Sequence, residues 1–230
     1  MTNAGFGAEP LIVIRRAFAT ALTLAGLAAL AGLAQLNPVA DAMAESRTAA
    51  LLAKPGALPD MALGPAKAPV TIVEYASLTC PHCAAFGENV FPMLKSKYID
   101  TGKLRFVFRE FPLEIKAAAA SMLARCIADG DAEKYFGAVE QLFKQQDQLM
   151  DQTTATLKQI GAQQAGMSER AVEGCVKDQA LLDKLKADQE FASKQLKVDA
   201  TPTFFINGEI SKGAMSFEEL DKKIRSLLKK

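Results

Sequence analysis

Cys80-Pro81-His82-Cys83 is the stretch of this 230-residue sequence whose residue types and spacing point most directly to chemistry. Two cysteines separated by two residues can close a disulfide with each other when the turn between them opens a helix. The sequence from Val70 to Ser77 is typical of a strand, and that from Ala84 to Tyr98 is typical of a helix. A C-x-x-C motif between a strand and a helix indicates thiol–disulfide exchange.

The two cysteines are expected to play different parts. Cys80 would lie at the helix N-terminus, where free N–H groups and the helix dipole favour the thiolate, with Pro81 suited to the first turn. Cys83 lies one turn further on and should be more buried, so that Cys80 forms a mixed disulfide and Cys83 resolves it. His82 is the only histidine of the chain and can donate towards the Cys80 thiolate. A stabilised thiolate makes the disulfide more oxidising, which favours oxidation of substrates.

Two other interpretations of this motif are an inert disulfide and half of a zinc site. A zinc site needs further ligands at close spacing, and the sequence has no second histidine. We therefore predict neither a metal nor a cofactor. Cys126 and Cys175 lie alone in helical stretches. If Cys80 pairs with Cys83, these two are left for each other, either as a disulfide that stabilises the helical region or as two buried thiols.

Thr201-Pro202 and Glu74 are further candidate site residues. Thr201-Pro202 precedes a short apolar strand. A cis proline beside Cys80 would leave the backbone of Thr201 free to pair with an extended substrate, whereas an ordinary trans proline would only open the strand. Glu74 is a carboxylate within an apolar strand, six residues before Cys80. It either has a raised pKa and transfers protons, or faces solvent from an edge strand.

The first 44 residues have the layout of an export signal. Arg15-Arg16 is followed by twenty uncharged residues, Ala17 to Leu36, and then by the small residues around Ala42 and Ala44. We expect cleavage after Ala44, or after Ala42. The alternative is a retained membrane anchor, because twenty apolar residues could span a bilayer. Either way the remaining chain would lie outside the cytoplasm, where disulfides persist.

The elements that must position the motif follow in a definite order. A helical region from about Glu114 to Lys197 separates the first two strands and their helix from a final hairpin, marked by Asn207-Gly208, and a last helix. This order predicts an α/β protein with a thioredoxin fold and a helical insertion. The expected parts are a signal peptide at 1–44, a connector at 45–69, a thioredoxin-like domain at 70–112 and 198–230, and the insertion at 113–197.

The length and composition are sufficient for one well-cored domain, with or without a smaller subdomain. The chain is 50% hydrophobic and 23% charged, with a net charge of +1. Because no strong positive charge is present, we expect no nucleic-acid partner.

The stretch Val73-Glu74-Tyr75-Ala76-Ser77-Leu78-Thr79-Cys80-Pro81-His82-Cys83, together with Thr201-Pro202-Thr203, resembles the DsbA family of bacterial thiol:disulfide oxidoreductases. The resemblance implies a periplasmic dithiol oxidase that is reoxidised by a membrane partner of the DsbB type. It carries over the redox pair, Glu74 and Thr201-Pro202. The second cysteine pair is similar to the alphaproteobacterial branch of the family. Thr rather than Val before the proline is shared with isomerases.

The leading hypothesis is an exported thiol:disulfide oxidoreductase that passes the Cys80–Cys83 disulfide to reduced exported proteins. The alternatives are a disulfide isomerase, a pathway-specific thiol reductase, or a non-catalytic chaperone or metal-binding module. Isomerases generally need a dimerisation domain, and the connector is too short for one. We therefore expect a monomer that meets the membrane only through its signal or its partner.

Overall fold

The computed structural model describes residues 38–229, and the chain divides into two units, Met1–Met43 and Ala44–Lys230. Of the predicted export signal at 1–44, residues 1–37 therefore lie outside the described part of the chain. From Pro38 the chain is helical, and this helix, α2 (Pro38–Leu52), extends into the predicted connector. Within the described residues, none of the helices has the length and apolarity needed to cross a membrane.

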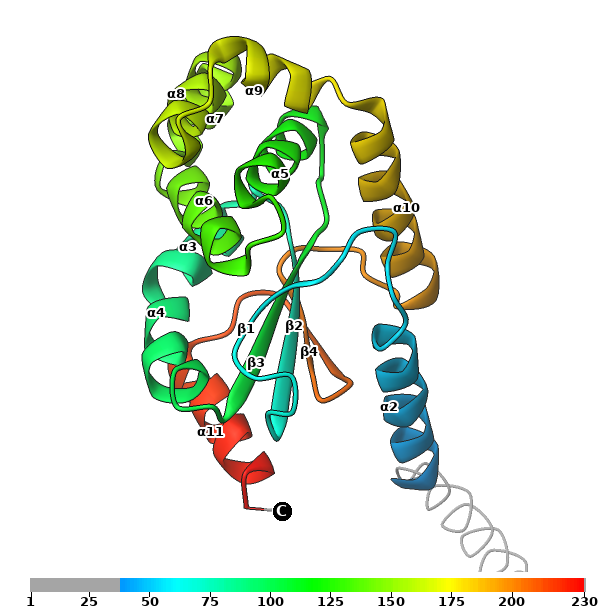
Figure 1. The fold of residues 1–230 in the computed structure, drawn as a ribbon. Coiled ribbons are helices and arrows are strands. Elements are labelled where there is room, and N and C mark those ends of the chain that lie inside the picture. Colours follow the sequence, from blue (N-terminus) through cyan, green and yellow to red (C-terminus); the bar gives the residue numbers. More distant parts are fainter. Residues whose placement is uncertain (1–37, 230) are drawn as a thin grey trace, which may run out of the picture. The chain divides into compact units, whose positions relative to one another are not determined.

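The second unit is built on a five-stranded sheet with the order β1-β3-β2-β4-β5 (Figure 1). Its strands are β1 (Met61–Leu63), β2 (Val70–Ala76), β3 (Leu104–Glu110), β4 (Thr203–Ile206) and β5 (Glu209–Lys212). The central strand β2 is parallel to β3 and antiparallel to β4. β1 adds an antiparallel edge strand from the predicted connector. β2 is thus flanked on both sides, and its residues are almost all buried.

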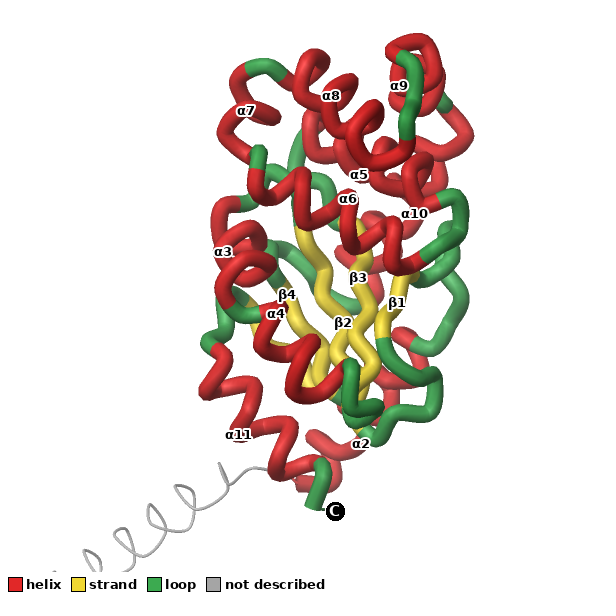
Figure 2. Tube along the Cα trace, turned by 60° about the vertical axis from the view of Figure 1, so that its left-hand side comes forward, coloured by secondary structure: helices red, strands yellow, loops and turns green. Residues whose placement is uncertain are grey.

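Both faces of the sheet are covered (Figure 2). On one face, Val70, Ile72 and Ala76 of β2 share a core with the helices that follow the motif and with the helical region. On the other face, Val73 and Tyr75 pack in a second core, which includes residues of α2 and α10. Because side chains alternate along a strand, Glu74 faces the first core together with Ile72 and Ala76.

The helix after the motif is interrupted, although the sequence from Ala84 to Tyr98 predicts a single helix. It is divided into α3 (Pro81–Asn89), α4 (Phe91–Leu94) and the π-helical turn η2 (Lys95–Ile99). Pro92 explains the break, because proline has no N–H to donate to the preceding turn and its ring crowds that turn. The prediction of a single continuous helix was therefore wrong.

A helical insertion follows β3 and ends before β4. It comprises α5 (Ile115–Ala128), α6 (Ala132–Lys144), α7 (Gln146–Asp151), α8 (Thr153–Ala165), α9 (Glu169–Val176) and α10 (Gln179–Gln195). The last helix, α11 (Phe217–Leu227), begins at a capping box formed by Ser216 and Glu219. This is the thioredoxin fold with a helical insertion that the order of elements predicts. The short helix α7 was not predicted as a separate element.

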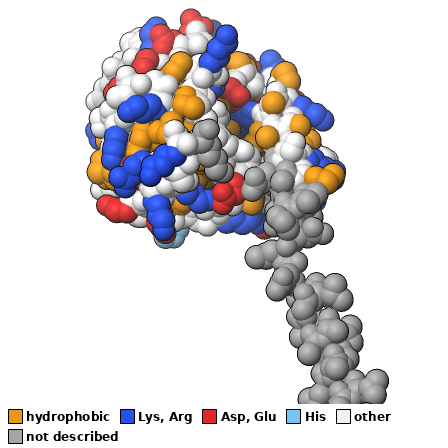
Figure 3. Space-filling view, turned by 90° about the horizontal axis from the view of Figure 1, so that it is seen from below, with side chains coloured by type: hydrophobic (Ala, Val, Ile, Leu, Met, Phe, Trp, Pro, Cys, Tyr) orange, Lys and Arg blue, Asp and Glu red, His pale blue; other side chains and the backbone are white. Residues whose placement is uncertain are grey.

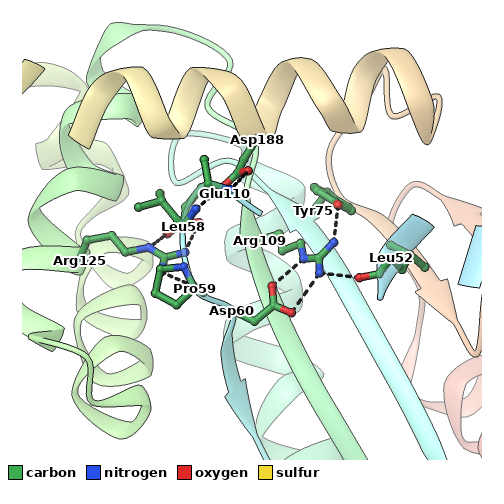
Figure 4. A network of polar contacts seen from close by, with 10 residues as sticks. Leu52, Leu58, Pro59, Asp60, Tyr75, Arg109, Glu110, Arg125 and Asp188 are labelled. Atoms are coloured by element: carbon green, nitrogen blue, oxygen red, sulfur yellow. Dashed lines mark hydrogen bonds and ion pairs between the residues drawn. The ribbon is translucent and has the colours of Figure 1, made fainter. Parts of the chain in front are cut away.

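A charged network holds the connector against the sheet and the insertion (Figure 4). Asp188 of α10 accepts hydrogen bonds from the backbone N–H groups of Ala57 and Leu58, at 2.6 and 2.9 Å. Arg125 of α5 donates to the carbonyl oxygen of Pro59, at 2.6 Å. Arg109 of β3 forms an ion pair with Asp60, at 2.8 Å. Residues 53–60, here called the strap, are thus bound to both parts of the fold.

Beneath the strap lies a buried ion pair. Arg125 and Glu110 are joined by two hydrogen bonds of 2.5 and 2.6 Å, and the hydroxyl of Tyr135 donates to the same carboxylate at 2.6 Å. All three residues are buried. A buried carboxylate with a bidentate guanidinium and a hydroxyl donor has its charge compensated and its lone pairs satisfied.

Seen from below in the orientation of Figure 1, the surface carries many lysine and arginine side chains around hydrophobic ones (Figure 3). Some of the cations of η2 and α11 belong to ion pairs. Lys97 and Arg225 both contact Asp221, at 2.6 and 2.5 Å, and Lys95 contacts Asp100 at 2.7 Å. Much of the local positive charge is therefore balanced within the protein.

Candidate redox site

Cys80 is held at the beginning of α3 by the end of the central strand. Its backbone is extended, its N–H donates to the carbonyl of Ser77 at 3.1 Å, and Pro81 is at the first helical position. Cys80 and Cys83 are both free thiols in this structure. The side chain of Gln146 on α7 donates to the carbonyls of Leu78 and Cys80, at 3.0 and 3.2 Å. No local pattern in the sequence predicts this contact between the insertion and the motif.

Both sulfur-bearing residues are buried, though to different degrees. Cys80 is 6% exposed and Cys83 is fully buried. The expected order of burial is therefore present. Cys80 is nevertheless largely buried itself and retains only a small exposed surface.

The two thiols have opposite electrostatic environments. The pKa of Cys80 is lowered to about 5, chiefly because the Cys83 thiol donates a hydrogen bond to it. The Thr201 side chain and the backbone N–H groups of Cys83 and His82 act in the same direction, while burial opposes them. The pKa of Cys83 is raised, because Cys83 donates to Cys80 and is itself buried. At neutral pH the reduced pair therefore holds one thiolate and one thiol.

His82 differs from its expected role. Its side chain is exposed, and within residues 38–229 its imidazole makes no hydrogen bond with Cys80. Its contribution to the low pKa of Cys80 comes from its backbone N–H. Donation from the imidazole remains a prediction.

Thr201 and Pro202 lie directly beside Cys80, and the peptide bond between them is cis. The Cys80 thiol donates to the carbonyl oxygen of Thr201, with 3.3 Å between sulfur and oxygen. The hydroxyl oxygen of Thr201 is buried and has no hydrogen-bond partner in the described part of the chain. The Thr201 side chain nevertheless lowers the pKa of Cys80. Its hydroxyl can therefore donate to Cys80 when Cys80 is a thiolate.

Glu74 lies in the middle of the sheet. It is 2% exposed, between Phe108 of β3 and Phe204 of β4. The alternative of a solvent-facing residue on an edge strand was therefore wrong. Its Oε1 has no hydrogen-bond partner among the described residues. Burial, followed by the negative charge of Cys80, raises the pKa of Glu74 well above its usual range. Glu74 in turn raises the pKa of Cys83.

A family model described as thioredoxin matches residues 57–226, which is most of the chain. The chain belongs to the thioredoxin family, among its DsbA-like members. The crystal structure of alpha-DsbA1 from Wolbachia pipientis is 35% identical, with a TM-score of 0.70, and the match covers 78% of this chain and 95% of that one. Disulfide bond formation protein D of Bacillus subtilis is 24% identical over 170 residues, or 73% of this chain and 76% of that protein.

Curated relatives from Rickettsia are longer than the matched region. The protein of Rickettsia bellii, provisionally named a protein-disulfide oxidoreductase, is 38% identical over 151 residues. The match covers 65% of this DsbA-like chain but only 57% of that protein. The chain therefore spans little more than half the length of these relatives.

In this DsbA-like chain the other two cysteines are bonded to each other. The sulfurs of Cys126 and Cys175 are 2.03 Å apart, and the bond joins α5 to α9 within the insertion. This is the pairing that the cysteine count leaves for them. Among residues 38–229 no group of three or more His, Cys, Asp or Glu side chains is arranged to hold a metal ion.

Proposed function

We propose that the protein is an exported thiol:disulfide oxidoreductase that transfers the Cys80–Cys83 disulfide to reduced exported proteins. The observation that carries the proposal is the difference between the two thiols: the pKa of Cys80 is lowered and that of Cys83 is raised. A low pKa makes Cys80 a good leaving group and stabilises the reduced enzyme, and both effects favour oxidation of a substrate.

The reaction starts from the oxidised enzyme. A substrate thiolate attacks the Cys80 sulfur, the Cys80–Cys83 bond breaks, and its electron pair leaves on Cys83, which takes up a proton. The second substrate thiolate then attacks the substrate sulfur of the mixed disulfide and expels Cys80 as a thiolate. The substrate is oxidised by two electrons and the enzyme is reduced by two.

Three residues around the pair have supporting roles in this proposal. The protonated carboxyl of Glu74 supplies the proton that Cys83 needs on leaving, because Glu74 is buried close to it. Thr201 offers its backbone to an extended substrate next to Cys80, with Pro202 fixing the turn.

The reduced enzyme would be reoxidised by a membrane partner of the DsbB type in the periplasm, as the family resemblance implies.

The test is to trap the mixed disulfide. The Cys83→Ala variant, incubated with a peptide that carries an activated disulfide, should accumulate an adduct at Cys80 that mass spectrometry localises. The Cys80→Ala variant should give none, and Cys126→Ser/Cys175→Ser with an intact redox pair should turn over normally. An adduct at Cys83, or no adduct at all, would contradict the proposal.

An isomerase remains the second candidate because of the buried threonine hydroxyl beside Cys80. The oxidised protein should form disulfides in a reduced substrate faster than the reduced protein rearranges a scrambled one. The reverse order would favour the isomerase. Thr201→Val should change the substrate rates more than it changes the reduction potential.

A further inference from the structure

A cavity of about 620 Å³ lies behind the redox site, between the helices that follow the motif and α6. Its wall includes six phenylalanines from four elements: Phe86, Phe91, Phe106, Phe108, Phe136 and Phe143. This volume lies within the range of about 300–1,000 Å³ that is typical of small-molecule sites. The aromatic wall is suited to a flat, apolar molecule.

The mouth of the cavity opens to solvent. The exposed side chains of Glu88, Glu133, Glu140 and Lys144 line it. Lys144 is paired with Glu140 at 2.5 Å, and Lys95, the other lysine of the lining, is paired with Asp100 at 2.7 Å. Neither lysine of the lining is left to compensate an anionic ligand. The glutamates lie at the exposed mouth, so a cation in the apolar inner part would also lack a counter-charge, and that part favours a neutral ligand.

One polar group lies at the inner end, the carboxyl group of Glu74. It is 2% exposed, and its Oε1 has no hydrogen-bond partner among residues 38–229. A buried polar atom without a partner is unfavourable, because it has lost its hydrogen bonds to water and gained none in the protein. The lining residues contributed by the neighbouring strands β1 and β3 are apolar: Leu63, Phe106 and Phe108. Away from its charged mouth, the cavity therefore offers one unsatisfied polar contact among apolar side chains.

The chemistry of that contact specifies the ligand. A protonated carboxyl group presents one O–H donor and one oxygen acceptor side by side. Burial keeps Glu74 in this form. A cyclic amide, whose N–H and C=O lie next to each other, matches both atoms at once.

We propose that this cavity binds a neutral, flat aromatic molecule whose edge carries an adjacent donor and acceptor, with its ring among the phenylalanines and its polar edge on Glu74. Neither thiol lines the cavity, although Glu74 is also the proposed proton donor to Cys83. It requires no redox step, and it stands whether or not the proposed oxidoreductase activity is correct.

The probe is 2-quinolone, and its matched control is 1-methyl-2-quinolone, which has nearly the same size but no N–H. Isothermal titration calorimetry on the oxidised, full-length protein should give about tenfold tighter binding of 2-quinolone, as expected for a net gain of one to two hydrogen bonds. Equal binding of the two compounds, or no binding of either at millimolar concentration, would overturn the proposal.

Three variants locate the site. Glu74→Gln keeps a donor beside an acceptor and should keep the preference for 2-quinolone. Glu74→Leu should bind both compounds equally, because the polar contact is gone. Val139→Phe, which fills the cavity from α6 without altering Glu74, should weaken both at least tenfold. Unchanged binding to the folded Val139→Phe variant, or a preference that persists in Glu74→Leu, would place the compounds elsewhere and refute the assignment.

Discussion

The reduction potential of the Cys80–Cys83 pair should depend on pH with two different slopes. Below pH 5 both thiols of the reduced pair are protonated, so two protons accompany two electrons and the potential falls by about 59 mV per pH unit. Above a Cys80 pKa of about 5 only Cys83 takes up a proton, because the pKa of Cys83 is raised. The slope should then fall to about 30 mV per pH unit.

The size of the effect at neutral pH follows from the same shift. Lowering the pKa of Cys80 from an ordinary value of about 8.5 to about 5 stabilises the reduced form at pH 7 by a factor of about 100. For a two-electron couple each factor of ten corresponds to about 30 mV. The disulfide should therefore be about 60 mV more oxidising at pH 7 than the same pair with an ordinary thiol at Cys80.

The folding stability of the reduced protein should change in the same pH range. The native pKa of Cys80 lies below that of the unfolded chain, which is about 8.5. The stabilisation is therefore fully present above pH 8.5 or so and is lost as the pH falls through about 5. The oxidised protein has no Cys80 thiolate and should lack this dependence.

The assay is equilibration with a dithiol buffer of known potential from pH 4 to pH 8, with the redox state determined after acid quenching and alkylation. Glu74→Gln is the matched control, since it removes the other titratable group beside the pair and should leave the break near pH 5. A single slope of about 59 mV per pH unit up to pH 8 would refute the reasoning, because Cys80 would then remain protonated.

The remaining predictions concern stability and can be measured by urea denaturation. In the oxidised protein, Glu74→Gln should remove a loss of stability that the wild type suffers as the pH rises above the unfolded carboxyl pKa of about 4.3, because native Glu74 keeps a proton that the unfolded chain releases. Parallel pH profiles would contradict this. Arg125→Met should cost about 3–5 kcal/mol, because it leaves the buried carboxylate of Glu110 without its cation. A cost below 1 kcal/mol or so would mean that water replaces the guanidinium. Cys126→Ser/Cys175→Ser should cost about 2–4 kcal/mol without shifting the thiolate titration of the redox pair. A shifted titration would show that the insertion disulfide affects the site.

The parts of the site that depend on neighbouring residues could be predicted from the sequence. The strand before Cys80, the helix start at Pro81 and the different burial of the two thiols follow from local pattern and helix geometry. The interruption of the helix at Pro92 was also within reach, because proline has no N–H.

The parts that depend on distant residues could not be predicted. Whether β2 is an edge strand, with Glu74 near solvent, depends on β4, which follows the insertion in the sequence and pairs with β2. The contact of Gln146 with the motif has no local signature. The aromatic cavity likewise forms only when α3, α4, α6 and β3 come together.

The strap also bears on where proteases can cut. Its Pro55-Gly56 and its exposed residues give it the composition of a flexible linker, in which nicking would be expected. Yet the N–H groups of Ala57 and Leu58 and the carbonyl of Pro59 are held by Asp188 and Arg125. A protease must draw an extended segment into its cleft, which would require breaking these charge-assisted bonds. Limited digestion should therefore spare the strap, and a shortened chain that keeps its fold should begin before Lys54.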